Sequence, residues 1–152
     1  MLSDSIAYQK AKAFAKRIVF LGKHLKDEHQ EYILSKQIVR SGTIIEAEPS
    51  AALISAIFYN KAPLHDGAMI IADERIVAAG AILPVSKNPN IPRHLGLRHR
   101  AAMGISEKSD AIVIIVSEET GTISMAIDGA YRLNLTAEDL ERNLTELLVT
   151  SY

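Results

Sequence analysis

Cysteine is absent from this 152-residue chain, and aromatic residues make up only 5% of it. Without cysteine the chain has no disulfide framework and no thiolate chemistry, so catalysis by a cysteine nucleophile is excluded. A lack of disulfides is typical of proteins in a reducing compartment, and we therefore expect a cytoplasmic location.

The chain also lacks an excess of charge of one sign and any long hydrophobic run. Its formal net charge of −1 gives no general attraction to nucleic acid or to an anionic membrane, so any anion-binding site must be local. The longest apolar stretch, Ile76–Val85, is about half of the ~20 residues that a membrane-spanning helix needs. The first residues lack the basic and then apolar pattern of a signal peptide. We expect neither a nucleic-acid partner nor a membrane segment in this chain.

The composition, 48% hydrophobic and 23% charged, is typical of a soluble globular protein. No internal repeat, low-complexity tract or linker is evident, so we expect a single domain over residues 1–152. Within it, residues 1–40 should form an N-terminal helical segment. Residues 42–134 should hold the sheet with the core motifs, and residues 135–149 should form a C-terminal helix.

Three segments carry apolar residues at helical spacing, which predicts amphipathic helices. Ser3 or Asp4 can cap the first predicted helix, near the N-terminus. The second predicted helix has Glu48 near its cap and Pro49 at its first position. The last predicted helix begins at Thr136 with a pattern similar to a capping box. The expected buried stripes are Ala7, Ala11, Phe14 and Ile18; Leu53, Ile54, Ile57 and Phe58; and Leu140, Leu144, Leu147 and Leu148.

Short apolar runs separated by turn residues predict the strands. The run Ala111–Val116 is continuously apolar, so both of its faces should be covered. Asp128-Gly129 is a favoured two-residue turn and predicts a hairpin. The expected fold class is α/β, with a central mixed β-sheet flanked by helices on both faces. The other expected strands are Gly42–Glu46, Ala68–Ala72, Ile76–Leu83, Thr122–Ile127 and Ala130–Leu133.

A first polar island, Pro63–Ala68, opens the apolar run Met69–Ala72. Asp66 at this place can hold a divalent cation or polarise a hydroxyl, and Gly67 permits a close backbone approach to a ligand. The adjacent His65 and Asp66 also resemble the dyad of HD-type metal-dependent phosphohydrolases, which lies on a helix. The structural alternative is a tight turn in which Asp66 only satisfies backbone N–H groups.

A second polar island, Gly96–Arg100, opens the helix-like run Ala101–Ile105. Arg98 and Arg100 can each grip phosphate oxygens bidentately, and a helix N-terminus adds free N–H groups and a favourable dipole. The alternative is a basic face that is only solvated. Taken with the first island, the cluster suggests a nucleotide site.

A third segment, Ser117–Gly121, follows the strand expected to be most buried. Open α/β sheets place ligand sites at such strand ends. Ser117 and Thr120 can donate hydrogen bonds to phosphate, and a glutamate can complete a metal shell of oxygen ligands. Taken alone, the segment is also explained as an acidic turn that ends at Gly121.

The motifs Pro-Leu-His-Asp-Gly-Ala, Ile-Leu-Pro-Val-Ser, Arg-His-Arg-Ala-Ala-Met-Gly-Ile-Ser-Glu, Ser-Asp-Ala and Ser-Glu-Glu-Thr-Gly occur in this order. This set resembles the diadenylate cyclase (DAC) domain of bacterial and archaeal enzymes, most strongly from about residue 44 to residue 126. The family commonly has threonine where this chain has Leu97, which removes a hydroxyl near the phosphates. The resemblance implies Asp66, Arg98, His99 and Arg100 as catalytic residues; Gly67, Ala68, Leu83, Leu97, Ser117, Glu119 and Thr120 as nucleotide-binding residues; and Asp66, His65 and Glu118 as metal ligands.

The resemblance implies condensation of two ATP into cyclic di-AMP and two pyrophosphate, with a divalent metal, Mg²⁺ or Mn²⁺, as cofactor. The product contains two identical phosphodiester links, so two sites should face each other across a two-fold axis. We therefore expect a homodimer, or a higher homo-oligomer built from it. The alternative is a weak or inactive sensor of adenine nucleotides with the same fold.

Overall fold

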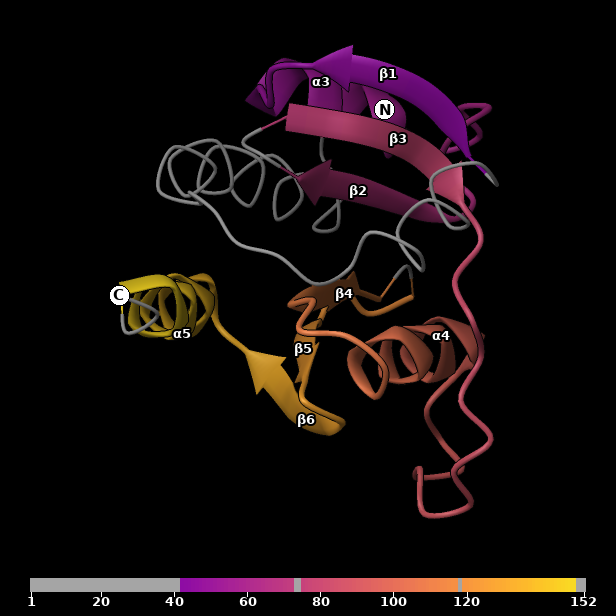
Figure 1. The fold of residues 1–152 in the computed structure, drawn as a ribbon, viewed down its shortest axis with the longest axis vertical. Helices are drawn as coiled ribbons and strands as arrows, with labels where there is room; N and C mark the ends of the chain where they lie inside the picture. Colours follow the sequence, from indigo (N-terminus) through magenta and orange to yellow (C-terminus); the bar gives the residue numbers. More distant parts are fainter. Residues whose placement is uncertain (1–41, 73–74, 118, 150–152) are drawn as a thin grey trace. The chain divides into compact units, whose positions relative to one another are not determined.

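The computed structural model describes residues 42–72, 75–117 and 119–149 (Figure 1). They fall into two compact units. Unit 1 holds the described residues up to Ile82 together with residues 137–149, and unit 2 spans Leu83–Thr136. The expected N-terminal helical segment, residues 1–40, lies outside the described residues, as does Glu118.

Unit 1 contains a three-stranded antiparallel sheet in the order β1-β3-β2, with helix α3 packed on it (Figure 1). Ile54 and Ile57 of the helix are buried against Ile76 and Ala79 of the central strand, which makes the core of this unit. In chain order the elements are β1 (Thr43–Ala47), α3 (Ala51–Ile57), β2 (Ala68–Ala72) and β3 (Arg75–Ala81).

Helix α3 begins later than the sequence predicts. Ser50 is its N-cap, and the Ser50 hydroxyl accepts a hydrogen bond from the N–H of Leu53 at 3.1 Å. Pro49 therefore precedes the cap, because a hydroxyl oxygen that pairs with a first-turn N–H fixes the helix start. The helix ends at Ile57, so the expected burial of Phe58 is wrong, and Phe58 is 40% exposed.

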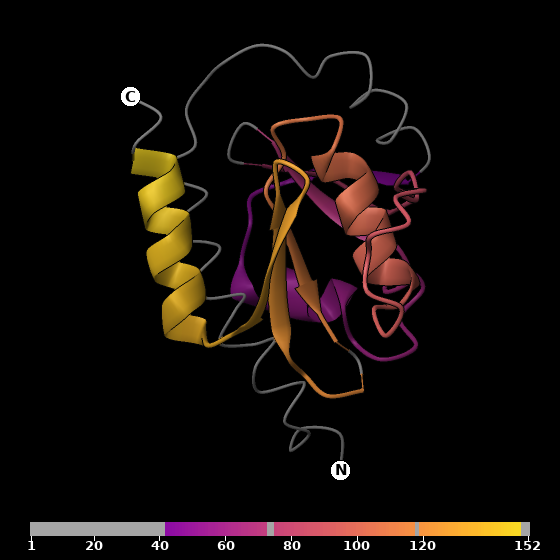
Figure 2. The ribbon, with the colours of Figure 1, turned by 90° about the horizontal axis from the view of Figure 1, so that it is seen from below.

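Unit 2 contains a second three-stranded antiparallel sheet, in the order β4-β5-β6. Helix α4 lies along one face of it (Figure 2), where Ala102 packs with Ile115 and Ala126. The predicted hairpin at Asp128-Gly129 is confirmed, and both residues have positive φ, +47° and +71°. The elements are α4 (Leu97–Ser106), β4 (Val113–Val116), β5 (Ile123–Ile127) and β6 (Ala130–Leu135).

The α/β class is confirmed, but the described strands form two antiparallel sheets where a single mixed sheet was expected. The sequence pattern locates strands, whereas their pairing depends on contacts between distant residues, which periodicity does not encode. The expected double coverage of β4 is met only in part, because Ile115 is buried while Val113, Ile114 and Val116 are half-buried. Helices on both faces of one sheet stay a prediction.

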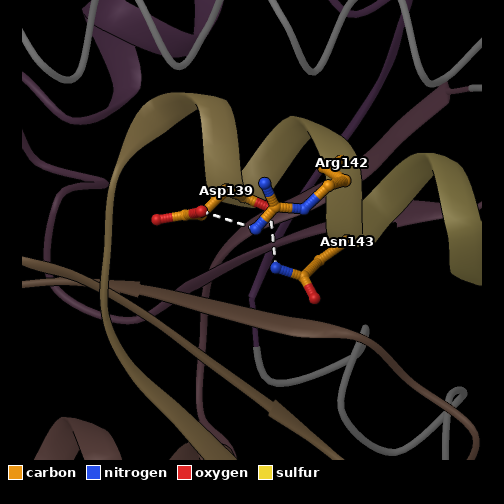
Figure 3. Close-up of polar contacts among 3 residues, drawn as sticks. All are labelled: Asp139, Arg142 and Asn143. Atoms are coloured by element: carbon orange, nitrogen blue, oxygen red, sulfur yellow. Dashed lines mark hydrogen bonds and ion pairs between the residues drawn. The ribbon is translucent and has the colours of Figure 1, made fainter.

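The predicted C-terminal helix is α5 (Ala137–Val149), with Leu140 and Leu144 buried. On its polar side the Arg142 guanidinium donates to the Asp139 carboxylate at 2.7 Å, and the Asn143 side-chain amide donates to the Asp139 carbonyl at 2.6 Å (Figure 3). No helix within residues 42–72, 75–117 and 119–149 is both long enough and apolar enough to cross a bilayer.

Gly104 brings α4 unusually close to the segment that follows β3. A Cβ atom at this position would lie 2.0 Å from the carbonyl oxygen of Pro84 and 2.8 Å from the backbone nitrogen of Ser86. Both neighbours are backbone atoms, which cannot rotate away as a side chain can. The position therefore requires glycine although it lies inside a helix.

Gly104→Ala should lower the free energy of unfolding by about 1–3 kcal/mol, the range for an overpacked site. Alanine is otherwise favoured over glycine in a helix by about 1 kcal/mol. A fall in the free energy of unfolding therefore reports steric overlap, and a rise reports helix propensity alone. Guanidinium chloride denaturation measures this free energy. Gly96→Ala serves as the control for steric overlap, because an added methyl there meets nothing within 4 Å, and any loss of stability in it reports the weaker N-cap preference of alanine. An unchanged or raised stability of Gly104→Ala would show that the close contact does not exist.

Candidate nucleotide-binding site

His65 and Asp66 lie in the turn that leads into β2. The His65 Nδ1 atom is 2.7 Å from the carbonyl oxygen of Ala62. A carbonyl oxygen carries no proton, so Nδ1 must donate, and in the neutral ring the lone pair is on Nε2. That Nε2 atom is 3.6 Å from a carboxylate oxygen of Asp66, whose side chain is 81% exposed. An imidazole nitrogen and a carboxylate thus lie side by side at the start of the strand.

Gly67 fixes this turn to the neighbouring strand. Its φ is +112°, and a Cβ atom here would lie 2.6 Å from the carbonyl carbon of Gly80 and 2.9 Å from the carbonyl oxygen of Ala81. Any side chain would push the turn away from β3 and displace Asp66 with it. The sequence predicts a close backbone approach to a ligand at Gly67. The close approach in the structure is to the backbone of β3, and the contact with a ligand stays a prediction.

The two side chains fit a divalent cation. Carboxylate oxygen suits Mg²⁺ and Mn²⁺, whereas imidazole nitrogen is the preferred ligand of softer divalent ions. Mg²⁺ commonly uses one or two carboxylates together with water and substrate phosphates. Glu118, the third predicted ligand, lies outside the described residues. Among the residues that are described, no three His, Asp or Glu side chains gather into one cluster. The dyad lies in a turn rather than on a helix, which argues against the HD-type hydrolase.

The second predicted cluster forms the first turn of α4. Its N-cap, Gly96, has no side chain to cap the first N–H groups, and no acidic residue lies in this turn. Leu97 and Arg98 are exposed, while His99 and Arg100 are half-buried. Uncapped N–H groups beside two guanidinium groups make a site suited to a phosphate chain.

Two hydrogen bonds from outside the helix hold this turn. The Ser86 backbone N–H donates to the carbonyl of Arg100 at 2.9 Å, and the Tyr131 hydroxyl donates to the carbonyl of His99 at 2.6 Å. Burial lowers the pKa of His99, and the nearby His94 lowers it further. The imidazole is therefore neutral at neutral pH, and Arg98 and Arg100 supply the positive charge.

The third segment is a tight turn closed by its own hydrogen bonds. The Ser117 hydroxyl accepts from the N–H of Thr120 at 3.3 Å, and the Ser117 carbonyl accepts from Gly121 at 2.8 Å. The Thr120 hydroxyl pairs with that of Thr122 at 2.8 Å. These bonds match the structural explanation of the segment, although the Ser117 hydroxyl retains its proton for a further acceptor. Glu119 is exposed.

The structure thus divides the predicted site residues into two groups. His65, Asp66, Gly67 and Ala68 belong to unit 1, whereas the α4 turn and the Ser117 turn belong to unit 2. Leu83 also belongs to unit 2 and lies beyond the end of β3, not within the strand as expected. The sequence reasoning assigned no role to Ser86 or Tyr131. Ser86 ends the motif Ile-Leu-Pro-Val-Ser, whereas no motif quoted above includes Tyr131.

Comparison with known proteins adds independent information. Residues 10–131 match the DAC family, described as DisA bacterial checkpoint controller nucleotide-binding. The chain is 48% identical over 99 residues to the diadenylate cyclase CdaS of Bacillus thuringiensis, and 46% identical over 106 residues to the cyclic di-AMP synthase CdaA of Bacillus subtilis. These alignments cover 64% and 70% of this chain but 49% and 39% of the relatives. The chain therefore spans about half or less of the length of these curated relatives.

Among solved structures, a double mutant of DacA from Staphylococcus aureus matches with a TM-score of 0.75 and 37% identity. That alignment covers 92% of this chain and 95% of the other. The family match includes both the His65–Asp66 turn and the start of α4. On these grounds the chain belongs to the DAC family, the DisA bacterial checkpoint controller nucleotide-binding family.

Proposed function

We propose that this chain is a diadenylate cyclase, which condenses two ATP molecules into cyclic di-AMP and two pyrophosphate. The observation that carries the proposal is a family match over residues 10–131 that contains both polar clusters, among relatives named diadenylate cyclases. The proposal assigns the activity in the names of these relatives to a chain that spans only part of the relatives' length.

The reaction requires two equivalent substitutions. The 3′-oxygen of each ATP attacks the α-phosphorus of the other, the bond to pyrophosphate breaks, and the proton of the 3′-hydroxyl passes to solvent water. Asp66 would orient and polarise the 3′-hydroxyl. Arg98, Arg100 and the N–H groups of α4 would stabilise the charge that builds on the α-phosphate and the departing pyrophosphate. Positioning and electrostatics supply the rate, because the reaction needs no covalent nucleophile.

The remaining predicted residues complete the nucleotide site in this proposal. Asp66 and the Nε2 atom of His65 would hold Mg²⁺ or Mn²⁺, with Glu118 as a further ligand. When bound, such an ion supplies Lewis-acid polarisation of hydroxyl and phosphate oxygens. Leu83 would border the adenine. The other contacts to the nucleotide would come from Gly67, Ala68, Leu97, His99, Ser117, Glu119 and Thr120.

The symmetry of the product sets the assembly. One site of this size holds one ATP, so two sites must face each other across a two-fold axis, and the interface is then the same patch on both subunits. The proposal therefore includes a homodimer as the catalytic unit.

The alternative is an adenine-nucleotide sensor with little or no turnover. Leu97 favours it, because this exposed side chain at the start of α4 offers no hydroxyl to phosphate. Incubation with ATP and Mn²⁺ or Mg²⁺, followed by product analysis, separates the candidates. Cyclic dinucleotide supports the cyclase, bound but unchanged ATP supports the sensor, and ADP or AMP would indicate a hydrolase.

Asp66→Asn should lower the cyclase rate by about 10²-fold or more while ATP binding largely survives, because the amide keeps the shape and removes the charge. Steady-state rates and calorimetric ATP binding measure the two effects. Asp128→Asn is the matched control: it removes one carboxylate from the hairpin turn, at a φ of +47° that asparagine tolerates. A near-normal rate in Asp66→Asn would remove this residue from the mechanism.

Arg98→Ala should weaken ATP binding by about 1.5–3 kcal/mol, the range for a hydrogen bond to a charged group, and should affect adenosine binding much less. Isothermal titration calorimetry with both ligands gives the comparison. Arg142→Ala is the control, since this arginine pairs with Asp139 on the surface of α5. Equal losses for ATP and adenosine would contradict a phosphate-binding role for Arg98.

A further inference from the structure

The geometry points to Tyr131 as a positioning residue that fixes the phosphate-binding turn of α4 through a hydrogen bond from its hydroxyl to the carbonyl of His99. Tyr131 belongs to β6 and follows the hairpin turn at Asp128-Gly129. The inference rests on the proposed function, because the turn it holds carries Arg98 and Arg100. No family motif quoted above includes Tyr131.

The hydrogen bond is short and joins distant parts of unit 2. The Tyr131 hydroxyl oxygen lies 2.6 Å from the His99 carbonyl oxygen, although the two residues are 32 apart in the sequence. The tyrosine ring also meets the His99 imidazole edge to face, with ring centres 6.1 Å apart and an interplanar angle of 67°. One side chain thus contacts both the backbone and the ring of the residue between the two arginines.

Tyr131 is a donor throughout the neutral pH range. Burial raises the pKa of its hydroxyl, an effect that the nearby Arg100 opposes and Glu107 reinforces. The hydroxyl therefore stays protonated, which the bond requires, because a carbonyl oxygen can only accept. The state of this bond does not change over the pH range in which an enzyme of this kind would be assayed.

The tyrosine ring is half-buried and packs against the core clusters that contain Met103 and Ala102 of α4. It also borders an open cavity of about 210 Å³. The apolar packing holds the ring, and the hydroxyl adds a polar bond from this side chain to the α4 backbone. A phenylalanine at this position would keep the apolar contacts with α4 and lose the hydrogen bond to the His99 carbonyl, which we call the anchor.

The anchor matters for the reaction because Arg98 and Arg100 flank His99 directly. A displacement of the His99 carbonyl carries both guanidinium groups with it, and phosphoryl transfer depends on their alignment with the developing charge. The Ser86 N–H holds the carbonyl of Arg100 independently. Loss of the Tyr131 hydroxyl should therefore loosen the turn without unfolding the helix.

The test is Tyr131→Phe, with Tyr59→Phe as the control that removes a hydroxyl from an exposed tyrosine of unit 1. We expect kcat for cyclic dinucleotide formation to fall about five- to tenfold, the loss of one net hydrogen bond at the transition state, while adenosine affinity stays unchanged. Backbone amide signals of residues 98–101 in a ¹⁵N NMR spectrum should shift in Tyr131→Phe and not in Tyr59→Phe.

Melting temperature separates positioning from a purely structural role. A structural role would lower the melting temperature of Tyr131→Phe and leave kcat unchanged well below the transition. Unchanged kcat in Tyr131→Phe, with an active wild-type protein, overturns the inference and leaves the proposed function standing. A wild-type protein that forms no cyclic dinucleotide overturns the proposed function, and the role of Tyr131 in that reaction falls with it.

Discussion

The contact between Gly104 and the backbone of Pro84 and Ser86 determines where α4 lies in unit 2. Because no Cβ separates the two segments, the Ser86 N–H can donate a hydrogen bond to the carbonyl of Arg100. The Ser86 hydroxyl donates to the Glu107 carboxylate at the other end of the helix. The helix is therefore tied near both ends to the segment after β3. In the proposed function this basic turn binds a chain of phosphates, and that role requires a fixed backbone.

Unit 1 solves the same problem with another glycine. Gly67 lies against the backbone of Gly80 and Ala81, and this contact fixes the position of the turn before β2. The Asp66 side chain in this turn is exposed. The adjacent His65 is oriented by the bond between its Nδ1 atom and the Ala62 carbonyl, which turns Nε2 toward Asp66. In both units, glycines that permit backbone-to-backbone contact position the charged residues that the proposed chemistry requires.

The sequence predicts local features well and long-range contacts poorly. The Asp128-Gly129 hairpin and the C-terminal helix α5 depend on residues close in the chain, and both are confirmed. Of the leucine stripe expected on α5, Leu140 and Leu144 are buried, while Leu147 and Leu148 are half-buried. The division into two antiparallel sheets and the bond between Tyr131 and His99 depend on residues far apart, and neither was predicted. The site residues could be named because their motifs are contiguous. The hydrogen bonds that hold them could not be predicted, since Ser86 and Tyr131 bind backbone carbonyls of residues distant in the sequence.

The central claim is that two protomers each provide half of one symmetrical reaction. The most direct test mixes wild-type protein with Asp66→Asn protein, with free subunit exchange verified by a tagged protomer. A mixed dimer can form at most one of the two phosphodiester links, so cyclic dinucleotide formation should fall as the square of the wild-type fraction. A fall in direct proportion to the wild-type fraction would mean that each protomer works alone, and would contradict the account.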